Sequence, residues 1–163
     1  MITIIAVGKL KKDEYRALTD DFIKRTNRYM KTVLIEVNDE DCDANRELAI
    51  RREGEAILSK IPQRAFVVAC TPEGRQMTSE AFADRLQDIF NSSVSDICFI
   101  IGGSAGLSDA VKERSDLKLS FSSFTFAHNL FRVILAEQIY RAFKILNHEI
   151  YRKCSDRFIL GSY

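Results

Sequence analysis

The chain alternates short apolar runs with longer stretches of helical spacing, and this alternation constrains its fold more than any other feature. The runs rich in β-branched residues are Ile2–Val7, Val33–Val37, Phe66–Cys70 and Ile97–Ile101. The stretches with helical spacing are Asp13–Met30, Asn45–Ile61, Thr78–Phe90, a short helix from Ser108 or Asp109, and His128–Leu146. Strands that alternate with helices predict an α/β fold, with a mostly parallel sheet and helices on both of its faces.

Length and composition favour a single domain spanning residues 1–163. The chain is 46% hydrophobic and 29% charged, which excludes a disordered or fibrous protein. Its first residues do not resemble a signal peptide, and no apolar run approaches the ~20 residues of a membrane span. The cysteines are far apart and include no Cys-x-x-Cys pair, so we expect reduced, buried thiols, no metal site and a cytoplasmic protein. These cysteines are Cys42, Cys70, Cys98 and Cys154.

Charge is unevenly distributed along the chain, although the net charge is only +1. Residues 1–31 contain eight basic and four acidic side chains, and residues 100–163 contain nine and six. Residues 36–58 contain three basic and eight acidic side chains. If the two basic ends meet in space they form a face that suits nucleic acid, but solvated helix faces explain the same pattern.

A glycine-rich loop follows the apolar run that ends at Ile101, in the sequence FIIGGSAGLSD. The spacing of Gly102, Gly103 and Gly106 matches neither the dinucleotide fingerprint nor a phosphate-binding loop. Ligands of open parallel sheets bind at the carboxyl ends of the strands, and glycine allows the backbone to approach them closely. The loop therefore indicates either a small-molecule site or a tight strand-to-helix turn without a ligand.

Two further loops follow strand-like segments. The first contains Thr71-Pro72-Glu73-Gly74, which predicts a turn. The second spans residues 121–127, where hydroxyl side chains alternate with Phe121, Phe124 and Phe126. Its backbone polar groups could bind the edge of an adenine between phenylalanine walls. The same alternation is typical of a final edge strand, which the pattern alone favours.

Three stretches carry a family resemblance: IGGSAGLS, LSFSSFTFAHNLFRVILAEQIYRAFKIL and HEIYRK. They resemble the ribosomal RNA large subunit methyltransferase H family, which belongs to the SPOUT class, and the resemblance extends over essentially the whole chain. The resemblance implies a C-terminal trefoil knot, which general rules of chain connection would exclude. It also implies a homodimer in which each active site is built partly from the other subunit. The most specific matches are Arg132, Glu137, Gln138, Tyr140, Arg141 and Ala142.

The resemblance implies that the glycine loop binds S-adenosylmethionine rather than a phosphate. The chain departs from the family at two of these positions, with Cys70 where relatives carry leucine and Thr71 where aspartate is common. Backbone contacts tolerate such changes of side chain. The cofactor positions that carry over are Cys70, Gly102, Gly103, Gly106, Phe121, Ser122, Ser123, Phe124, Thr125 and Phe126.

The activity that the resemblance implies is methylation of nitrogen 3 of a pseudouridine in large-subunit ribosomal RNA, on the assembled ribosome. Direct displacement at the sulfonium methyl requires alignment, and the proton on the attacking nitrogen must leave. Glu137 and Arg141 are four residues apart and can pair on a helix, with catalysis and a structural ion pair as alternatives. For His128, the alternatives are a capping or packing role and a contact with the substrate. The catalytic candidates are His128, Arg141, Tyr151 and Arg152, and the substrate-binding candidates are Arg132, Glu137 and Lys153.

The end of the chain departs from the family pattern. Ile150 stands in place of a proline, Arg152 in place of a histidine, and residues 154–163 form an extra tail. Arg152 cannot act as a base near neutral pH because a guanidinium stays protonated. The alternative is therefore a catalytically weak relative that binds the cofactor and acts as a ribosome-binding module. A doubly wound oxidoreductase is a further alternative, which the missing dinucleotide fingerprint disfavours.

Overall fold

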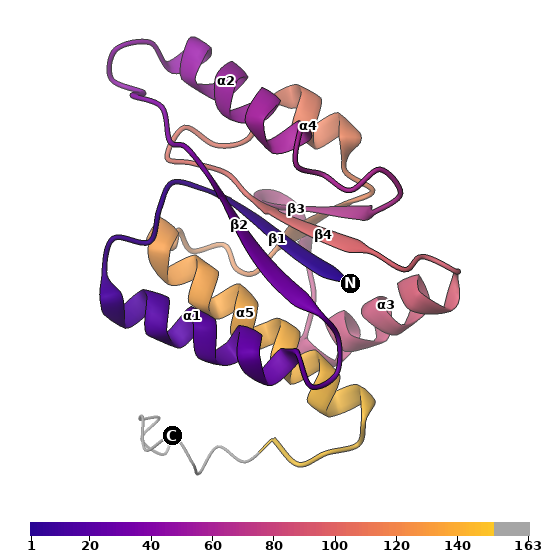
Figure 1. Ribbon diagram of the computed structural model, residues 1–163. Helices are drawn as coiled ribbons and strands as arrows, with labels where there is room; N and C mark the ends of the chain where they lie inside the picture. The colour runs from indigo at the N-terminus through magenta and orange to yellow at the C-terminus, as the bar shows by residue number, and fades with distance from the viewer. Residues whose placement is uncertain (152–163) are drawn as a thin grey trace.

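The computed structural model describes residues 1–151, in which five strands alternate with five helices (Figure 1). The strands are β1 (Ile2–Val7), β2 (Thr32–Val37), β3 (Phe66–Gln76), β4 (Ile97–Ile101) and β5 (Leu117–Ser120). The helices are α1 (Asp13–Thr26), α2 (Arg46–Leu58), α3 (Ser79–Asn91), α4 (Asp109–Arg114) and α5 (His128–Leu146). Arg152, Lys153, Cys154 and the rest of the tail lie outside the described residues.

The strands form one sheet in the order β2-β1-β4-β3-β5, and each pair of neighbours is parallel. Figure 1 shows α1, α3 and α5 on one face of the sheet and α2 and α4 on the other. The predicted α/β fold with helices on both faces is therefore confirmed. The central strands are buried on both sides, which explains their continuous apolar sequence.

Alternate residues of each strand face two separate cores. Ile4 and Phe99 belong to the core under α3 and α5, whereas Ile5 and Ile100 belong to the core under α2 and α4. This division follows from the two-residue period of a strand, which sends successive side chains to opposite faces. The sheet is thus held from both sides, and its carboxyl edge is left for the connecting loops.

Side-chain caps fix where three of the helices begin. The Asn45 side chain accepts a hydrogen bond from the amide of Leu48 (3.0 Å) and starts α2. Thr78 and Ser108 do the same for α3 and α4. These starts agree with the sequence prediction and satisfy amide groups that a helix start leaves without partners.

Helix α1 differs from its prediction. It ends at Thr26 rather than near Met30, and Leu18 of the expected apolar face is 49% exposed. The buried residues of α1 are instead Thr19 and Thr26, whose hydroxyl groups donate to the carbonyls of Tyr15 and Phe22. Because its polar groups are satisfied within the helix, this threonine face can be buried against the rest of the protein.

The edge of the sheet at β3 and β5 also differs from the prediction. Residues 71–74 do not end β3, which continues to Gln76 after a register shift that places both Cys70 and Arg75 opposite Leu119. A Cβ at Gly74 would lie 2.6 Å from the Leu119 backbone, so the bulge needs glycine there. The edge-strand interpretation of residues 121–127 is wrong, because β5 ends at Ser120.

The cysteines and helices of the described part add three findings. Among residues 1–151, Cys42, Cys70 and Cys98 are free thiols. Only Cys98 is fully buried, so the expectation of buried thiols holds for Cys98, whereas Cys42 and Cys70 are partly exposed. No helix in the described part is long and apolar enough to cross a membrane. Within the same residues, no group of three or more His, Cys, Asp or Glu side chains is placed to hold a metal ion.

Candidate active site

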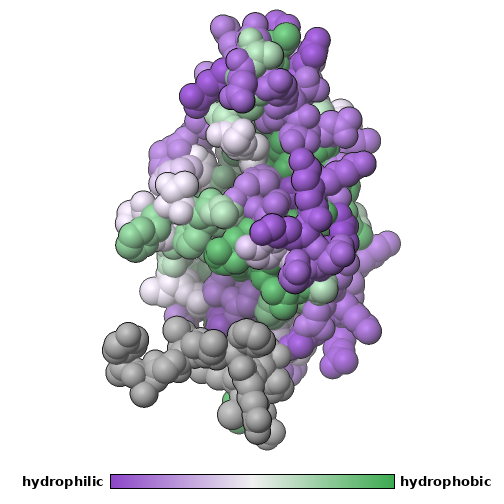
Figure 2. All heavy atoms as spheres, turned by 90° about the vertical axis from the view of Figure 1, so that its left-hand side faces the viewer, coloured by the Kyte–Doolittle hydropathy of each residue, from purple (hydrophilic) through white to green (hydrophobic). Residues whose placement is uncertain are grey.

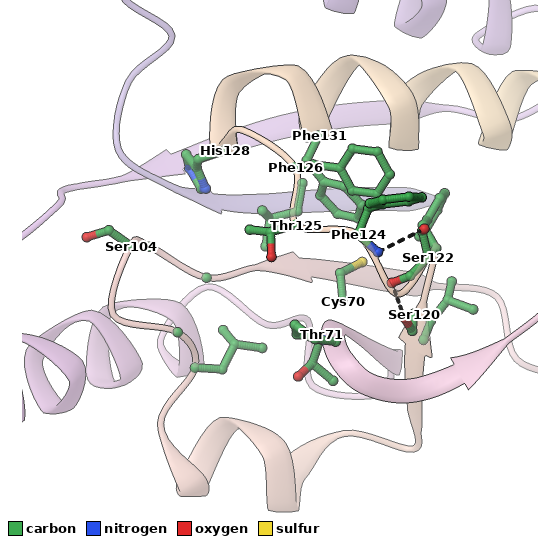
Figure 3. Close-up of a pocket in the computed structure, with 18 of the residues that line it drawn as sticks. Cys70, Thr71, Ser104, Ser120, Ser122, Phe124, Thr125, Phe126, His128 and Phe131 are labelled. Atoms are coloured by element: carbon green, nitrogen blue, oxygen red, sulfur yellow. Dashed lines mark hydrogen bonds between the residues drawn. The ribbon is translucent and has the colours of Figure 1, made fainter.

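The irregular part of β3 at Cys70, Thr71 and Pro72 and the loops that follow β4 and β5 meet at the carboxyl edge of the sheet and enclose a cavity of about 490 Å³ (Figure 3). The first turn of α5 closes the cavity on the side of His128 and Phe131. Segments distant in the sequence thus converge on one space, as expected for the ligand-binding edge of a parallel sheet. The glycine loop therefore borders a cavity.

Nine of the ten predicted cofactor positions line this cavity. Ser123 is the exception: it is exposed and does not contribute to the lining. Burial raises the pKa of the Cys70 thiol to about 12, so this side chain offers a neutral, apolar wall rather than a nucleophile. The nine are Cys70, Gly102, Gly103, Gly106, Phe121, Ser122, Phe124, Thr125 and Phe126.

The glycines shape the loop between β4 and α4. The Gly106 amide donates to the Gly103 carbonyl (3.1 Å), and Gly106 has a positive φ of 94°. A Cβ at Gly102 would lie 2.9 Å from the Leu107 side chain and 3.0 Å from the Gly106 carbonyl. The loop therefore folds back on itself so tightly that only glycine fits at position 102, independently of any ligand.

Two glutamates support the cavity from different sides: Glu53 behind the glycine loop and Glu73 beside Thr71 of β3. Glu53 is 2% exposed, and its Oε1 accepts from the amide of Glu40 (3.0 Å), whereas Oε2 has no partner in the described part of the chain. A Cβ at Gly103 would lie 2.7 Å from this Oε2. Burial raises the pKa of Glu53, whereas hydrogen bonds from Lys112 and Thr71 lower the pKa of Glu73 to about 2.

The segment after β5 is a loop held by its own side chains. The Ser120 hydroxyl donates to the Ser122 carbonyl (3.1 Å), and the Ser122 hydroxyl accepts from the Phe124 amide (3.0 Å). The Phe121 ring packs edge-on against Phe131, with centroids 5.0 Å apart. The phenylalanines thus form an apolar wall, except for Phe124, which is 80% exposed.

Sequence reasoning missed several lining residues, including Leu119 and Phe131. The register would have indicated Leu119, because it lies opposite Cys70 in the sheet. Helical spacing would have indicated Phe131, which is one turn after His128 on the same face of α5.

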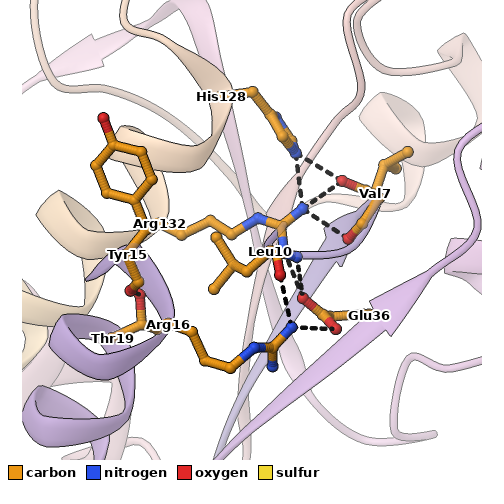
Figure 4. Close-up of polar contacts among 9 residues, drawn as sticks. Val7, Leu10, Tyr15, Arg16, Thr19, Glu36, His128 and Arg132 are labelled. Carbon is orange, nitrogen blue, oxygen red and sulfur yellow. Dashed lines mark hydrogen bonds and ion pairs between the residues drawn. The ribbon is translucent and has the colours of Figure 1, made fainter. Parts of the chain in front are cut away.

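The polar side chains in the first turn of α5 point toward the interior of the protein (Figure 4). Arg132 is 1% exposed and donates to the carbonyls of Val7 (2.5 Å) and Gly8 (2.7 Å) and to Glu36 Oε1 (2.9 Å). His128 Nε2 lies 2.6 Å from the same Val7 carbonyl. The predicted contact between Arg132 and RNA does not fit this placement, because the guanidinium is buried and already bound to the protein.

The second half of α5 carries a different cluster, formed by Glu137, Arg141 and Tyr151. Arg141 Nε donates to Glu137 Oε1 (3.0 Å), so the predicted pairing along the helix is present. The Tyr151 hydroxyl donates to the same oxygen (2.9 Å), and the Arg141 guanidinium lies 4.0 Å from the centre of the Tyr151 ring. None of the three lines the large cavity.

The residues before Tyr151 are tied to the turn after α1 and to α5. The Tyr29 hydroxyl donates to Glu149 Oε2 (3.0 Å), and Lys144 pairs with the same carboxylate. These contacts lower the pKa of Glu149. Ile150, which stands where the family carries proline, is 78% exposed. The chain thus reaches Tyr151 from a fixed point beside the end of α1.

The surface at the carboxyl edge is mixed in character. Figure 2 views the molecule from this side and shows hydrophobic side chains gathered in the middle of the face, with hydrophilic ones beside them. In α5, Leu135, Ile139 and Phe143 are buried in the core of the subunit, whereas Leu130 is 37% exposed. Part of the apolar surface of α5 is therefore used within the chain, and part remains accessible.

With this geometry in view, comparison with known proteins assigns the chain to a family. A family model described as "Predicted SPOUT methyltransferase" matches residues 1–152. The chain belongs to the SPOUT methyltransferase family. It is 45% identical over 157 residues to the ribosomal RNA large subunit methyltransferase H of Clostridium botulinum (strain Okra / Type B1), and 44% identical to that of Alkaliphilus oremlandii (strain OhILAs). In both cases the match covers 93% of this chain and 99% of the relative.

A solved structure agrees with this chain in architecture. The "probable methylase family protein" of Haemophilus influenzae Rd KW20 superimposes with a TM-score of 0.56 at 13% identity, over 93% of this chain and 70% of that chain. At this identity the likeness supports the fold alone. Membership in the SPOUT methyltransferase family implies the C-terminal trefoil knot that the resemblance predicted.

Proposed function

We propose that this SPOUT methyltransferase uses S-adenosylmethionine to methylate nitrogen 3 of a pseudouridine in large-subunit ribosomal RNA. The observation that carries the proposal is the convergence of nine cofactor positions from separate loops on one cavity. Relatives that match over almost their whole length are named for the same activity class. The assignment of the cofactor therefore depends on several segments of the chain together and not on the glycine loop alone.

The cavity suits S-adenosylmethionine in shape and polarity. Phenylalanine rings supply apolar walls for the adenine, and backbone groups around Gly102 and in residues 121–126 supply hydrogen bonds to its edge. Gly106 leaves open space, since a Cβ there would meet no atom within 4 Å. When bound, the cofactor supplies a methyl group on a cationic sulfur. The protein's part is to bind and orient it and to remove the proton of the attacking nitrogen.

The active form proposed here is a homodimer. Glu137, Arg141 and Tyr151 do not line the cavity of their own chain, so we assign them to a site shared with the second subunit. Leu130 and Ile134, which the core leaves at least partly exposed, provide apolar surface for that contact. Arg152 and Lys153, which follow Tyr151 directly, are proposed to approach RNA from the same place.

The proposed partner is the ribosome, in the cytoplasm. Helix α1, from the basic first part of the chain, lies beside α5 in the layer shown in Figure 1. A basic face built from both subunits would supply the salt-dependent component of RNA binding. The relatives are named as methyltransferases, and this favours an enzyme over a ribosome-binding module without activity.

The direct test is methylation of ribosomes from a strain that lacks the endogenous enzyme. Purified protein with S-adenosylmethionine should add one methyl group to large-subunit RNA, and mass spectrometry of nucleosides should place it on pseudouridine. Ribosomes that already carry the modification are the control and should accept none. Uptake of NAD in place of S-adenosylmethionine, or full activity of a stable monomer, would contradict the proposal.

A further inference from the structure

The polar network under the first turn of α5 decides the protonation of a residue in the cavity. His128 lines the cavity, and its Nε2 lies near two groups: the Val7 carbonyl at 2.6 Å and the Nη2 of Arg132 at 2.9 Å. A single ring nitrogen cannot donate to the carbonyl and accept from the guanidinium at the same time. The hydrogen-bond partners of Arg132 resolve this choice.

Each terminal nitrogen of a guanidinium carries two hydrogens. In Arg132 the two hydrogens of Nη2 have carbonyl acceptors, Val7 at 2.5 Å and Gly8 at 2.7 Å, and Nη1 is directed to Glu36 at 2.9 Å. No hydrogen of Nη2 is left for the histidine. His128 Nε2 must therefore carry a proton and donate it to Val7, and in the neutral ring Nδ1 is then without a proton (Figure 4).

The charges around His128 favour the neutral ring. Burial lowers the pKa of His128, and the charge of Arg132 adds to this effect, while the bond to Val7 and the charge of Asp39 oppose it. Glu36 is the partner of Arg132 and also pairs with Arg16 of α1. The charged groups that face the site thus come from β2, the loop after it, α1 and α5.

We propose that Arg132 is a positioning residue that fixes His128 with its proton on Nε2, so that Nδ1 is a hydrogen-bond acceptor for an N–H group in the cavity. Within residues 1–151, no protein group donates to Nδ1. Two occupants of the proposed site carry a suitable N–H: the ammonium of the cofactor's amino-acid end and the imide of a uracil-type base. Only the identity of the occupant rests on the proposed function; the assignment of the ring proton does not.

The imide case gives His128 a role in the reaction. The imide proton moves to Nδ1, the electron pair of the nitrogen forms the bond to the methyl carbon, and the bond from that carbon to sulfur breaks with its pair on sulfur. His128 then carries protons on both nitrogens beside the Arg132 charge, which favours release of the new proton. In the ammonium case the same nitrogen holds the cofactor and takes no proton.

Nitrogen-15 NMR of the imidazole rings tests the ring assignment without any turnover. The full-length protein should show His128 with a proton on Nε2 and a bare Nδ1 from pH 6 to 8, and His148, which is exposed, is the internal reference. A proton on Nδ1 in the neutral ring, or a cationic His128 at pH 7, overturns the proposal. Arg132→Lys should disturb this protonation pattern, since one ammonium group cannot make the same set of hydrogen bonds as the two terminal nitrogens of the guanidinium. The control Arg114→Lys should leave the pattern unchanged.

Two substitutions of His128 keep the proposal testable if the Arg132 variant does not fold. In His128→Gln the amide can reach the position of Nε2 and keep the bond to Val7, but the acceptor at Nδ1 is lost. In His128→Asn the amide stands near Nδ1 and the bond to Val7 is lost. If the ammonium is the partner, we expect the glutamine variant to be the less active of the two, despite the more native-like structure. If the imide is the partner, neither amide can take the proton and both variants should lose activity.

Calorimetry with S-adenosylhomocysteine, without RNA, distinguishes the two occupants. If the ammonium is the partner, His128→Gln weakens binding about tenfold, as expected for loss of a charge-assisted bond. If the imide is the partner, binding is unchanged and methyl transfer falls about 100-fold or more. If neither binding nor transfer changes, the proposal is wrong. If the protein binds S-adenosylhomocysteine and yet methylates no ribosome, the proposed function fails while the ring assignment stands.

Discussion

The two halves of α5 differ in where their polar side chains find partners. In the first half, Arg132 and His128 bond to the end of β1 and to β2, and they help to close a cavity within one chain. In the second half, Glu137 and Arg141 bond to each other and to Tyr151 near the end of the described chain. The first half thus serves a site that one subunit can complete, whereas the second half presents its charges outside that site.

The largest expected effect is that of Gly102→Val in the cavity wall. The valine Cβ would lie 3.0 Å from the Gly106 carbonyl, so the loop must open, and overpacking of this kind costs about 1–3 kcal/mol. We expect calorimetry to show a loss of S-adenosylhomocysteine affinity of up to about 100-fold. Gly106→Ala is the control: it meets no atom and has only an unfavourable φ, so its affinity should stay within about tenfold.

Arg141→Ala tests whether the second half of α5 is independent of the cavity. It removes the ion pair with Glu137 and the contact with the Tyr151 ring. We expect methyl transfer to ribosomes to fall about 100-fold, as for loss of a charged group that acts on the reacting atoms or the RNA. S-adenosylhomocysteine affinity should be unchanged. If the affinity falls as far as the rate, the two halves are coupled and the comparison fails.

Local signals in the sequence account for what was predicted of the fold. Glycine spacing, caps such as Asn45 and Thr78, and the alternation of strand-like and helix-like stretches depend on near neighbours, and the corresponding elements are present. The cofactor positions came from the family resemblance, and all except Ser123 line one cavity. Their loops are brought together by the order of the strands, which the spacing alone does not give.

The rest could not be predicted because it depends on distant pairs. Arg132 is polar and lies on a helix, so its sequence position indicates an exposed side chain. Its partners Glu36 and Val7 are 96 and 125 residues away, and together with the Gly8 carbonyl they make its burial possible. Leu18 shows the reverse error, because an apolar residue at helical spacing remains exposed when a threonine face is buried instead.

Glu53→Gln tests whether the buried carboxylate behind the glycine loop lowers the free energy of unfolding. The pKa of Glu53 is raised in the folded state, so its contribution to stability is present below the unfolded pKa and is lost as pH rises through the folded value. The glutamine has no charge to bury. We expect it to stabilise the cofactor-free protein at pH 8 by about 1 kcal/mol and by less at pH 5, as measured by urea unfolding.

The matched control for Glu53 is Glu55→Gln, an exposed position on the same helix, which should change the free energy of unfolding by less than about 0.5 kcal/mol. A glutamine variant at position 53 that is less stable than the native protein at both pH values would contradict the assignment. In that case the carboxylate would stabilise the wall by contacts that the amide cannot make.

The smallest expected effect is that of Glu73→Gln, at the other side of the cavity. Glu73 pairs with Lys112 (2.8 Å) and accepts from the hydroxyl of Thr71, which lines the cavity. These bonds depress its pKa to about 2, so the stability that they contribute is present above the unfolded pKa of about 4.3 and is lost as pH falls toward 2. Because the side chain is 50% exposed, solvent screening limits the contribution to about 0.5–1 kcal/mol.

Glu73→Gln should therefore lower the free energy of urea unfolding at pH 7, and the difference from the native protein should shrink at pH 3 and in 1 M salt. The Thr71 hydroxyl loses its acceptor and turns, so S-adenosylhomocysteine affinity should fall by no more than about threefold. This result would separate a residue that supports the wall from Gly102, which forms it. A loss of affinity comparable to that of Gly102→Val would mean that the bulge between Cys70 and Arg75 is itself held in place by this carboxylate, and that the cavity depends on β3 as much as on the glycine loop.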